Sequence, residues 1–134
     1  MAEERSDLLK LIAAQDHGAL AVALDDGADP DTADRWGVTL LGHAAGRGDL
    51  EAVRLLLDRG ARVDGASDAG NRPLMMAAAG GHLEVMILLL DQGADPTATN
   101  KWGFGAADWA SWPGNAADAQ ALLHSRRGHE PDGS

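Results

Sequence analysis

The chain has 134 residues, 45% hydrophobic and 4% aromatic, and a formal net charge of −10. Its 21 acidic residues against 11 basic ones would repel a phosphate backbone, so we expect no nucleic acid partner. No apolar run approaches the roughly 20 residues of a membrane span, and the lack of cysteine excludes disulfides and thiolate chemistry. Because the N-terminal MAEERSDLLK also lacks the features of a secretory signal, we expect a cytoplasmic protein that does not engage a membrane.

Glycine spacing indicates an internal repeat of 33 residues. Three series share this spacing, namely Gly27, Gly60, Gly93; Gly37, Gly70, Gly103; and Gly48, Gly81, Gly114. Self-similarity at such a period is typical of stacked repeat units rather than one closed core. We expect about four units, approximately at residues 5–31, 32–64, 65–97 and 98–124, followed by a flexible tail at 125–134.

The first unit, SDLLKLIAAQDHGALAVALDDGADPD, predicts two helices. It has Gln15 where the later units have glycine, and no hairpin precedes it. These departures are expected of a unit that caps the N-terminal end of a repeat array.

The second and third units each predict two short antiparallel helices. In the second unit, TLLGHAAGRG has small and apolar residues at helical spacing, and DLEAVRLLLDRG forms an apolar face. Gly60 and Gly93 follow the second helices, where we expect positive φ. We expect the core to run through Leu41, Leu56, Leu57, Leu74, Leu88 and Leu89.

The fourth unit, NKWGFGAADWASWPGNAADAQALLH, departs from the others and is predicted to cap the C-terminal end. It keeps Gly103 and Gly114 but has Gly105, Ala106, Ala107 and Asp108 at the start of its first helix.

The repeated unit resembles the ankyrin repeat, whose consensus runs G-x-T-P-L-H-x-A-A-x-x-G-H-x-x-x-V-x-x-L-L-x-x-G-A-D. The matching residues of the second unit are Gly37, Thr39, Leu41, Ala44, Ala45, Gly48, Val53, Leu56, Leu57, Gly60 and Ala61. Those of the third are Gly70, Pro73, Leu74, Ala77, Ala78, Gly81, His82, Val85, Leu88, Leu89, Gly93, Ala94 and Asp95. The resemblance implies one domain at residues 1–124, an all-α solenoid of about four stacked helix-turn-helix units with short β-hairpin connections.

By this resemblance the chain is expected to be a protein–protein interaction module, an adaptor or inhibitor, with no cofactor or bound metal. The family generally binds partners through a concave face of hairpin tips and first helices. The candidate partner-binding residues are Arg35, Trp36, His43, Arg47, Asn71, Met76, Lys101, Trp102, Phe104, Asp108 and Trp112. We expect a monomer, and the acidic composition favours a partner with a basic patch.

Small residues at Ala69, Ala79 and Gly80 lie between Trp36 in the second unit and Trp102 and Trp112 in the fourth, which suggests a pocket walled by these three tryptophans. Trp109 is predicted to pack inward, because it falls on a first-helix position that normally packs inward and because large residues often close the last unit of a stack.

The alternative function is a small-molecule binding protein or an atypical enzyme that uses this pocket near His43 and Asp108. These two residues could form an acid and base pair across units. However, Asp108 occupies the consensus histidine position, where a polar side chain hydrogen-bonds locally. No H-E-x-x-H, G-x-S-x-G or phosphate-loop motif is present, and no two histidines are spaced for a metal on one helix. We therefore expect that the protein is not an enzyme.

Overall fold

The computed structural model describes residues 2–110 and 116–127, with side chains for 7–110 and 117–126. Within these ranges the chain forms eight helices and no named strand. The helices form four consecutive pairs: α1 (Ala2–Ala14) with α2 (His17–Asp25), α3 (Leu40–Arg47) with α4 (Leu50–Asp58), α5 (Pro73–Gly80) with α6 (Leu83–Asp91), and α7 (Ala106–Trp109) with α8 (Ala116–Arg127). Helix α8 continues to Arg127, past residue 124, where we placed the end of the repeat domain.

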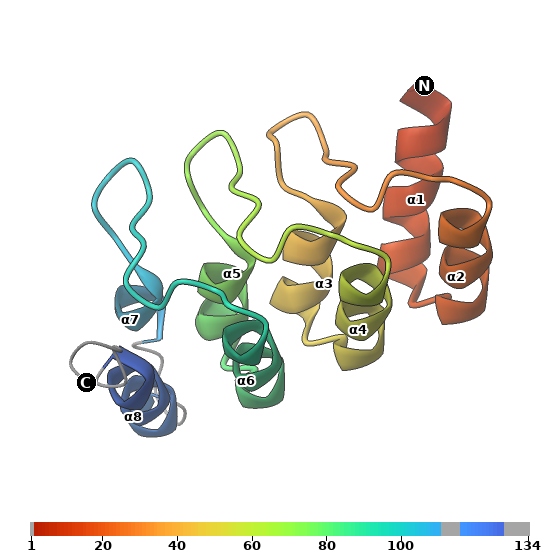
Figure 1. The fold of residues 1–134 in the computed structure, drawn as a ribbon. Helices are drawn as coiled ribbons and strands as arrows, with labels where there is room; N and C mark the ends of the chain where they lie inside the picture. The colour runs from red at the N-terminus through yellow and green to blue at the C-terminus, as the bar shows by residue number, and fades with distance from the viewer. Residues whose placement is uncertain (1, 111–115, 128–134) are drawn as a thin grey trace.

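The pairs stack along one direction (Figure 1). The first helices α1, α3, α5 and α7 form one row, the second helices α2, α4, α6 and α8 form the other, and the loops between pairs project to one side. Each helix contacts its partner and the equivalent helix of the neighbouring pair. This confirms the expected all-α repeat solenoid.

The core runs through all four pairs because each buries one apolar stripe against the next. Leu41, Leu56, Leu74 and Leu89 are 0–1% exposed, as predicted. Leu57 and Leu88 are only half-buried, which corrects the expectation that they lie in the core. Both are adjacent in sequence to a fully buried leucine, and one residue along a helix turns the side chain by about 100°.

The turns between helices depend on left-handed backbone conformations. Gly60 and Gly93 have φ of 92° and 99°, which confirms the prediction made for them. Between the helices of one pair, Gly48 and Gly81 have φ of 72° and 71°. In the first pair Gln15 takes this place with φ of 56°, so the chain keeps the turn without the glycine.

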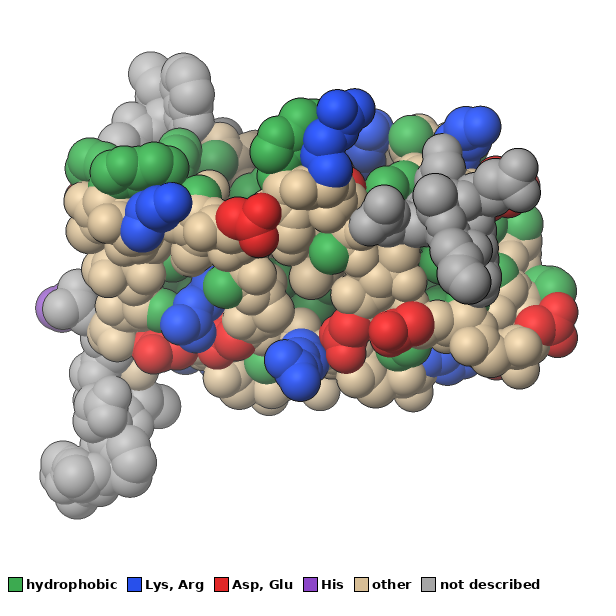
Figure 2. Space-filling model, turned by 90° about the horizontal axis from the view of Figure 1, so that it is seen from above, with side chains coloured by type: hydrophobic (Ala, Val, Ile, Leu, Met, Phe, Trp, Pro, Cys, Tyr) green, Lys and Arg blue, Asp and Glu red, His purple; other side chains and the backbone are tan. Residues whose placement is uncertain are grey.

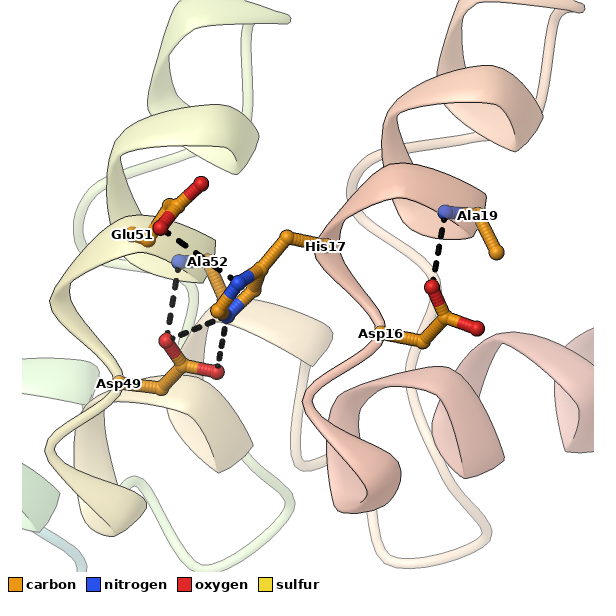
Figure 3. A network of polar contacts seen from close by, with 6 residues as sticks. All are labelled: Asp16, His17, Ala19, Asp49, Glu51 and Ala52. Carbon is orange, nitrogen blue, oxygen red and sulfur yellow. Dashed lines mark hydrogen bonds and ion pairs between the residues drawn. The ribbon is translucent and has the colours of Figure 1, made fainter.

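Polar contacts also join neighbouring units. The ring of His17, at the start of α2, lies between Asp49 and Glu51 at the start of α4 (Figure 3). Two arginines form ion pairs between second helices of neighbouring units: Arg59 Nη2 lies 2.9 Å from Asp25 Oδ1, and Arg126 Nη2 lies 2.7 Å from Asp91 Oδ1.

The predicted hairpins are loops with little β structure. Two isolated antiparallel bridges, Ala33 with Thr39 and Thr99 with Gly105, occur in the described part of the chain. In the same part, no helix combines the length and the apolar character that a membrane crossing needs.

Candidate binding surface

The tips of the loops are shaped by one side chain in each of two units. Asp34 Oδ1 accepts hydrogen bonds from the backbone N–H groups of Trp36 at 2.9 Å and Val38 at 3.0 Å. Asn100 Oδ1 accepts equivalent bonds from Trp102 at 2.9 Å and Phe104 at 3.0 Å. Side chains of this kind stabilise turns by replacing a backbone acceptor.

Hydrogen bonds also connect the tips of successive units. The backbone N–H of Asp68 donates to the carbonyl of Trp36 at 2.9 Å, and that of Lys101 donates to the carbonyl of Ala69 at 3.0 Å. The three tips therefore form a continuous surface, which we call the tip ridge: Arg35, Trp36, Asp68, Ala69, Lys101 and Trp102.

The tip ridge presents large apolar side chains to solvent. Trp36 is 62% exposed and Trp102 is 64% exposed, and the neighbouring Phe104 is 52% exposed. A cationic side chain lies over each tryptophan ring. Arg35 Cζ is 4.7 Å from the centre of the Trp36 ring, and Lys101 Nζ is 5.6 Å from the centre of the Trp102 ring. Figure 2 looks down onto the loop side and shows hydrophobic side chains along one edge, with Lys and Arg next to them.

Below the tip ridge, the first helices contribute His43, Met76 and Trp109, which are equivalent positions in the 33-residue register. Met76 packs close to Gly46, because a Cβ at Gly46 would lie 3.5 Å from that of Met76. Trp109 is 37% exposed, so the expectation that it packs inward is wrong. Trp109 has the same place in the repeat as His43 and Met76, which are half-buried. All three lie on the side of the first helices that faces away from the core.

His43 connects a first helix to a tip, since its Nε2 lies 2.8 Å from Asp34 Oδ2. Partial burial alone would raise the pKa of Asp34, but the hydrogen bonds from His43, Val38 and Trp36 outweigh it and hold that pKa below its usual value. The Asp34 carboxylate is thus ionised and fully engaged in shaping the tip. Sequence reasoning missed Asp34 and Asn100, although positions 34, 67 and 100 are Asp, Ser and Asn, all residues that favour turns.

The structure does not bring together the acid and base pair that sequence suggested. His43 lies in α3 and Asp108 lies in α7, and α5 packs between these helices. His43 is paired with Asp34, and Asp108 Oδ2 accepts a hydrogen bond from the Gly105 backbone N–H at 2.9 Å, at the start of its own helix.

The tryptophan-walled pocket stays a prediction, because the described residues do not test it. Two shallow cavities, of about 200 and 250 Å³, lie between α4 and α6, lined by residues such as Leu50, Glu84 and Ile87. They belong to the second helices rather than to the tip ridge. The third wall suggested for the pocket, Trp112, lies outside the described residues.

Of the other predicted residues, Arg47 is exposed at the end of α3, and Lys101 is exposed in the tip ridge. Asn71 is half-buried, and its side-chain oxygen accepts a hydrogen bond from Asn100 Nδ2 at 3.0 Å. Asn71 therefore connects the tips of the third and fourth units.

Helix pairs repeated at a fixed period, with an exposed ridge formed by the loops between them, define a solenoid repeat protein. A family model described as ankyrin repeats, in three copies, matches residues 9–100, and the chain belongs to the ankyrin repeat family. No curated protein matches the chain. Ankyrin repeats generally act as protein–protein interaction modules.

Proposed function

We propose that this protein is an adaptor or inhibitor that binds a partner protein through the tip ridge and the adjoining face of the first helices. The observation that carries the proposal is the exposure of Trp36 and Trp102, at 62% and 64%, in the folded chain. Water contact with two indole rings is unfavourable, and tryptophan contributes much of the binding energy at many protein interfaces.

The shape of the surface supports the same function. Asp34 and Asn100 accept hydrogen bonds from the backbone N–H groups of both tips, so the backbone that carries the two rings is fixed before a partner arrives. A preorganised surface loses less conformational entropy on binding. The binding residues proposed here are Arg35, Trp36, His43, Arg47, Asn71, Met76, Lys101, Trp102, Phe104, Asp108, Trp109 and Trp112.

We further propose that the protein acts as a cytoplasmic monomer without enzymatic activity. The lack of cysteine fits a reducing compartment. His43 pairs with the Asp34 carboxylate, and Asp108 accepts a hydrogen bond from the Gly105 backbone N–H, which argues against an acid and base role for these two residues.

The test compares proteins captured from a cell extract by the wild-type chain, by the Trp36→Ala/Trp102→Ala double variant and by Val22→Ala. Val22 in α2 is 60% exposed and lies outside the proposed surface, so it is a matched control. A true partner should be retained by Val22→Ala and lost by the double variant, since each tryptophan is expected to contribute ~2 kcal/mol.

Thermal unfolding of the same variants separates binding from folding. We expect the double variant to unfold close to the wild-type temperature, because both rings are largely in water. Capture of the same proteins by all three chains would mean that the partner-binding surface lies elsewhere on the protein.

A further inference from the structure

We propose that the partner segment that contacts the tip ridge is acidic and apolar, with carboxylate side chains next to large apolar ones. The inference rests on the proposed function, namely that this ridge binds a protein. It differs from the expectation of a basic partner, which followed from the net charge of the whole chain.

The first argument is that no carboxylate of the described chain neutralises the cations of this face. Among the described residues, Arg35, Arg47 and Lys101 form no ion pair. In contrast, Arg59, Arg72 and Arg126 lie within 4 Å of Asp25, Asp64 and Asp91, and so connect helices or loops of the fold. Among the described residues, Lys10, Arg54 and Arg62 away from the ridge also form no ion pair, so the three cations of this face are available to a partner without being the only unpaired ones.

The second argument is that little negative charge opposes those cations. The Asp34 side chain is 11% exposed, and its two oxygens are bound by His43 and by the tip backbone. The equivalent residues Ser67 and Asn100 are neutral. The exposed acidic residues of this face are Asp68 and Asp108, which are fewer than its three exposed cations.

Counted over exposed side chains alone, this face therefore carries three positive and two negative charges, in a protein whose net charge is −10. In Figure 2 most acidic side chains lie along the edge opposite the hydrophobic one, interspersed with Lys and Arg side chains, and an acidic side chain also lies beside the cations of the hydrophobic edge. Charges farther away than about 10 Å are largely screened at physiological salt, so the ridge presents its own local sign to a contacting segment.

The third argument is the geometry of each tip. Because Arg35 and Lys101 are held at 4.7 and 5.6 Å from the rings of Trp36 and Trp102, any group that covers a ring also meets a cation. An apolar side chain followed by a carboxylate side chain would cover the ring and pair with the cation beside it. A basic segment would bring like charges together at both tips, which is costly at an interface.

The binding mode follows from the backbone. The Trp36 and Ala69 carbonyls and the Asp68 and Lys101 N–H groups already pair with one another. The segment is therefore held by side chains rather than added as a strand. Trp36 and Trp102 are two units apart, about 20 Å at ordinary helix packing distances, which six or seven extended residues span.

The experiment selects binders to the full chain from a displayed library of random peptides about 16 residues long, enough to reach both tips in extended or helical form. Selected peptides are then tested against the Trp36→Ala/Trp102→Ala and Val22→Ala variants. We expect enrichment of Asp and Glu beside Leu, Phe or Trp, and loss of binding to the double variant only.

One selected peptide is then synthesised, together with a form in which every Asp and Glu is replaced by Asn or Gln. We expect the neutral form to bind about tenfold more weakly at low salt. The Arg35→Glu/Lys101→Glu variant should bind the acidic peptide more weakly by a similar factor. Arg54→Glu, a charge reversal at an exposed residue of α4, should change the affinity for that peptide less than about twofold.

The outcomes separate the two proposals. Peptides that depend on the tryptophans but are neutral or basic would overturn the acidic partner and leave protein binding by the ridge intact. Peptides that bind the double variant as well as wild type, or a library that yields no binder, would overturn the proposed surface and this inference with it.

Discussion

The imidazole Nε2 of His17 lies 2.8 Å from Oδ1 and 2.9 Å from Oδ2 of Asp49, so one ring joins the start of α2 to the start of α4 (Figure 3). The Asp49 side chain is 4% exposed, and its Oδ1 also accepts the Ala52 N–H at the beginning of α4. The hydrogen bond to Asp49 raises the pKa of His17 despite partial desolvation, and the charges of Asp49, Glu51 and Asp16 add to that increase.

This contact predicts that the protein is less stable at pH 8 than at pH 6. The pKa of His17 is raised above its unfolded value of about 6.5, so its contribution is complete below that pH and is lost as pH rises through the folded-state pKa. Asp34 and Asp95 have lowered pKa values, so they titrate in acid, outside this window.

The free energy of unfolding, measured with urea at pH 6 and at pH 8, tests the prediction. The difference in unfolding free energy between the two pH values should shrink in His17→Gln. It should persist in His124→Gln, a control at an exposed position of α8. An unchanged difference in His17→Gln would assign the pH dependence to other groups.

A second prediction concerns Gln15, which has φ of 56° in the turn between α1 and α2. A left-handed conformation costs a residue with a Cβ about 1–2 kcal/mol, and glycine avoids this cost. Gln15→Gly should therefore raise the free energy of unfolding by about 1 kcal/mol, seen as a higher urea midpoint with an unchanged slope. A lower midpoint would show that Gln15 makes a stabilising contact that outweighs the strain.

The fold was predictable because its local requirements recur along the chain. Glycine at positive φ and an apolar stripe on each second helix repeat every 33 residues, so the structure expected of one unit also applies to the next. Even Gln15, predicted as a departure from the pattern, keeps the backbone conformation of Gly48 and Gly81. The half-buried Leu57 and Leu88 show the limit of this approach, since the width of an apolar stripe depends on how closely neighbouring helices pack.

The candidate site was predictable in part. Exposure of Trp36 and Trp102 follows from their place in a turn. The inward packing predicted for Trp109 from its helix position and its size is wrong, and the equivalent residues His43 and Met76 are only half-buried as well. Which carboxylate pairs with which histidine was not predictable. The His17–Asp49 contact joins residues 32 positions apart, and its distance depends on how two units stack.

A third prediction concerns Gly93, which has φ of 99° and no atom within 4 Å of the place a Cβ would occupy. Any penalty at this position therefore comes from the backbone alone. Gly93→Val should lower the free energy of unfolding by about 1–2 kcal/mol, and Gly93→Asn by less, because asparagine tolerates the left-handed region better. Chemical denaturation of the three chains checks this order, which a neutral Gly93→Val would contradict.

The last prediction tests the local charge of the tip ridge without any partner. A variant with Trp102, Trp109 and Trp112 replaced by phenylalanine reports only the fluorescence of Trp36, beside which Arg35 lies at 4.7 Å from the ring. A chain of net charge −10 should attract caesium and repel iodide, so its average charge predicts stronger quenching by caesium. If the local charge dominates, iodide should quench Trp36 about twofold more strongly at low ionic strength, and added salt should reduce the difference. Replacing Arg35 with serine should remove the preference for iodide, whereas Arg54→Ser should keep it. Stronger quenching by caesium in the Trp36 variant would mean that the field of the whole molecule controls this surface, and the expectation of a basic partner would then be the better one.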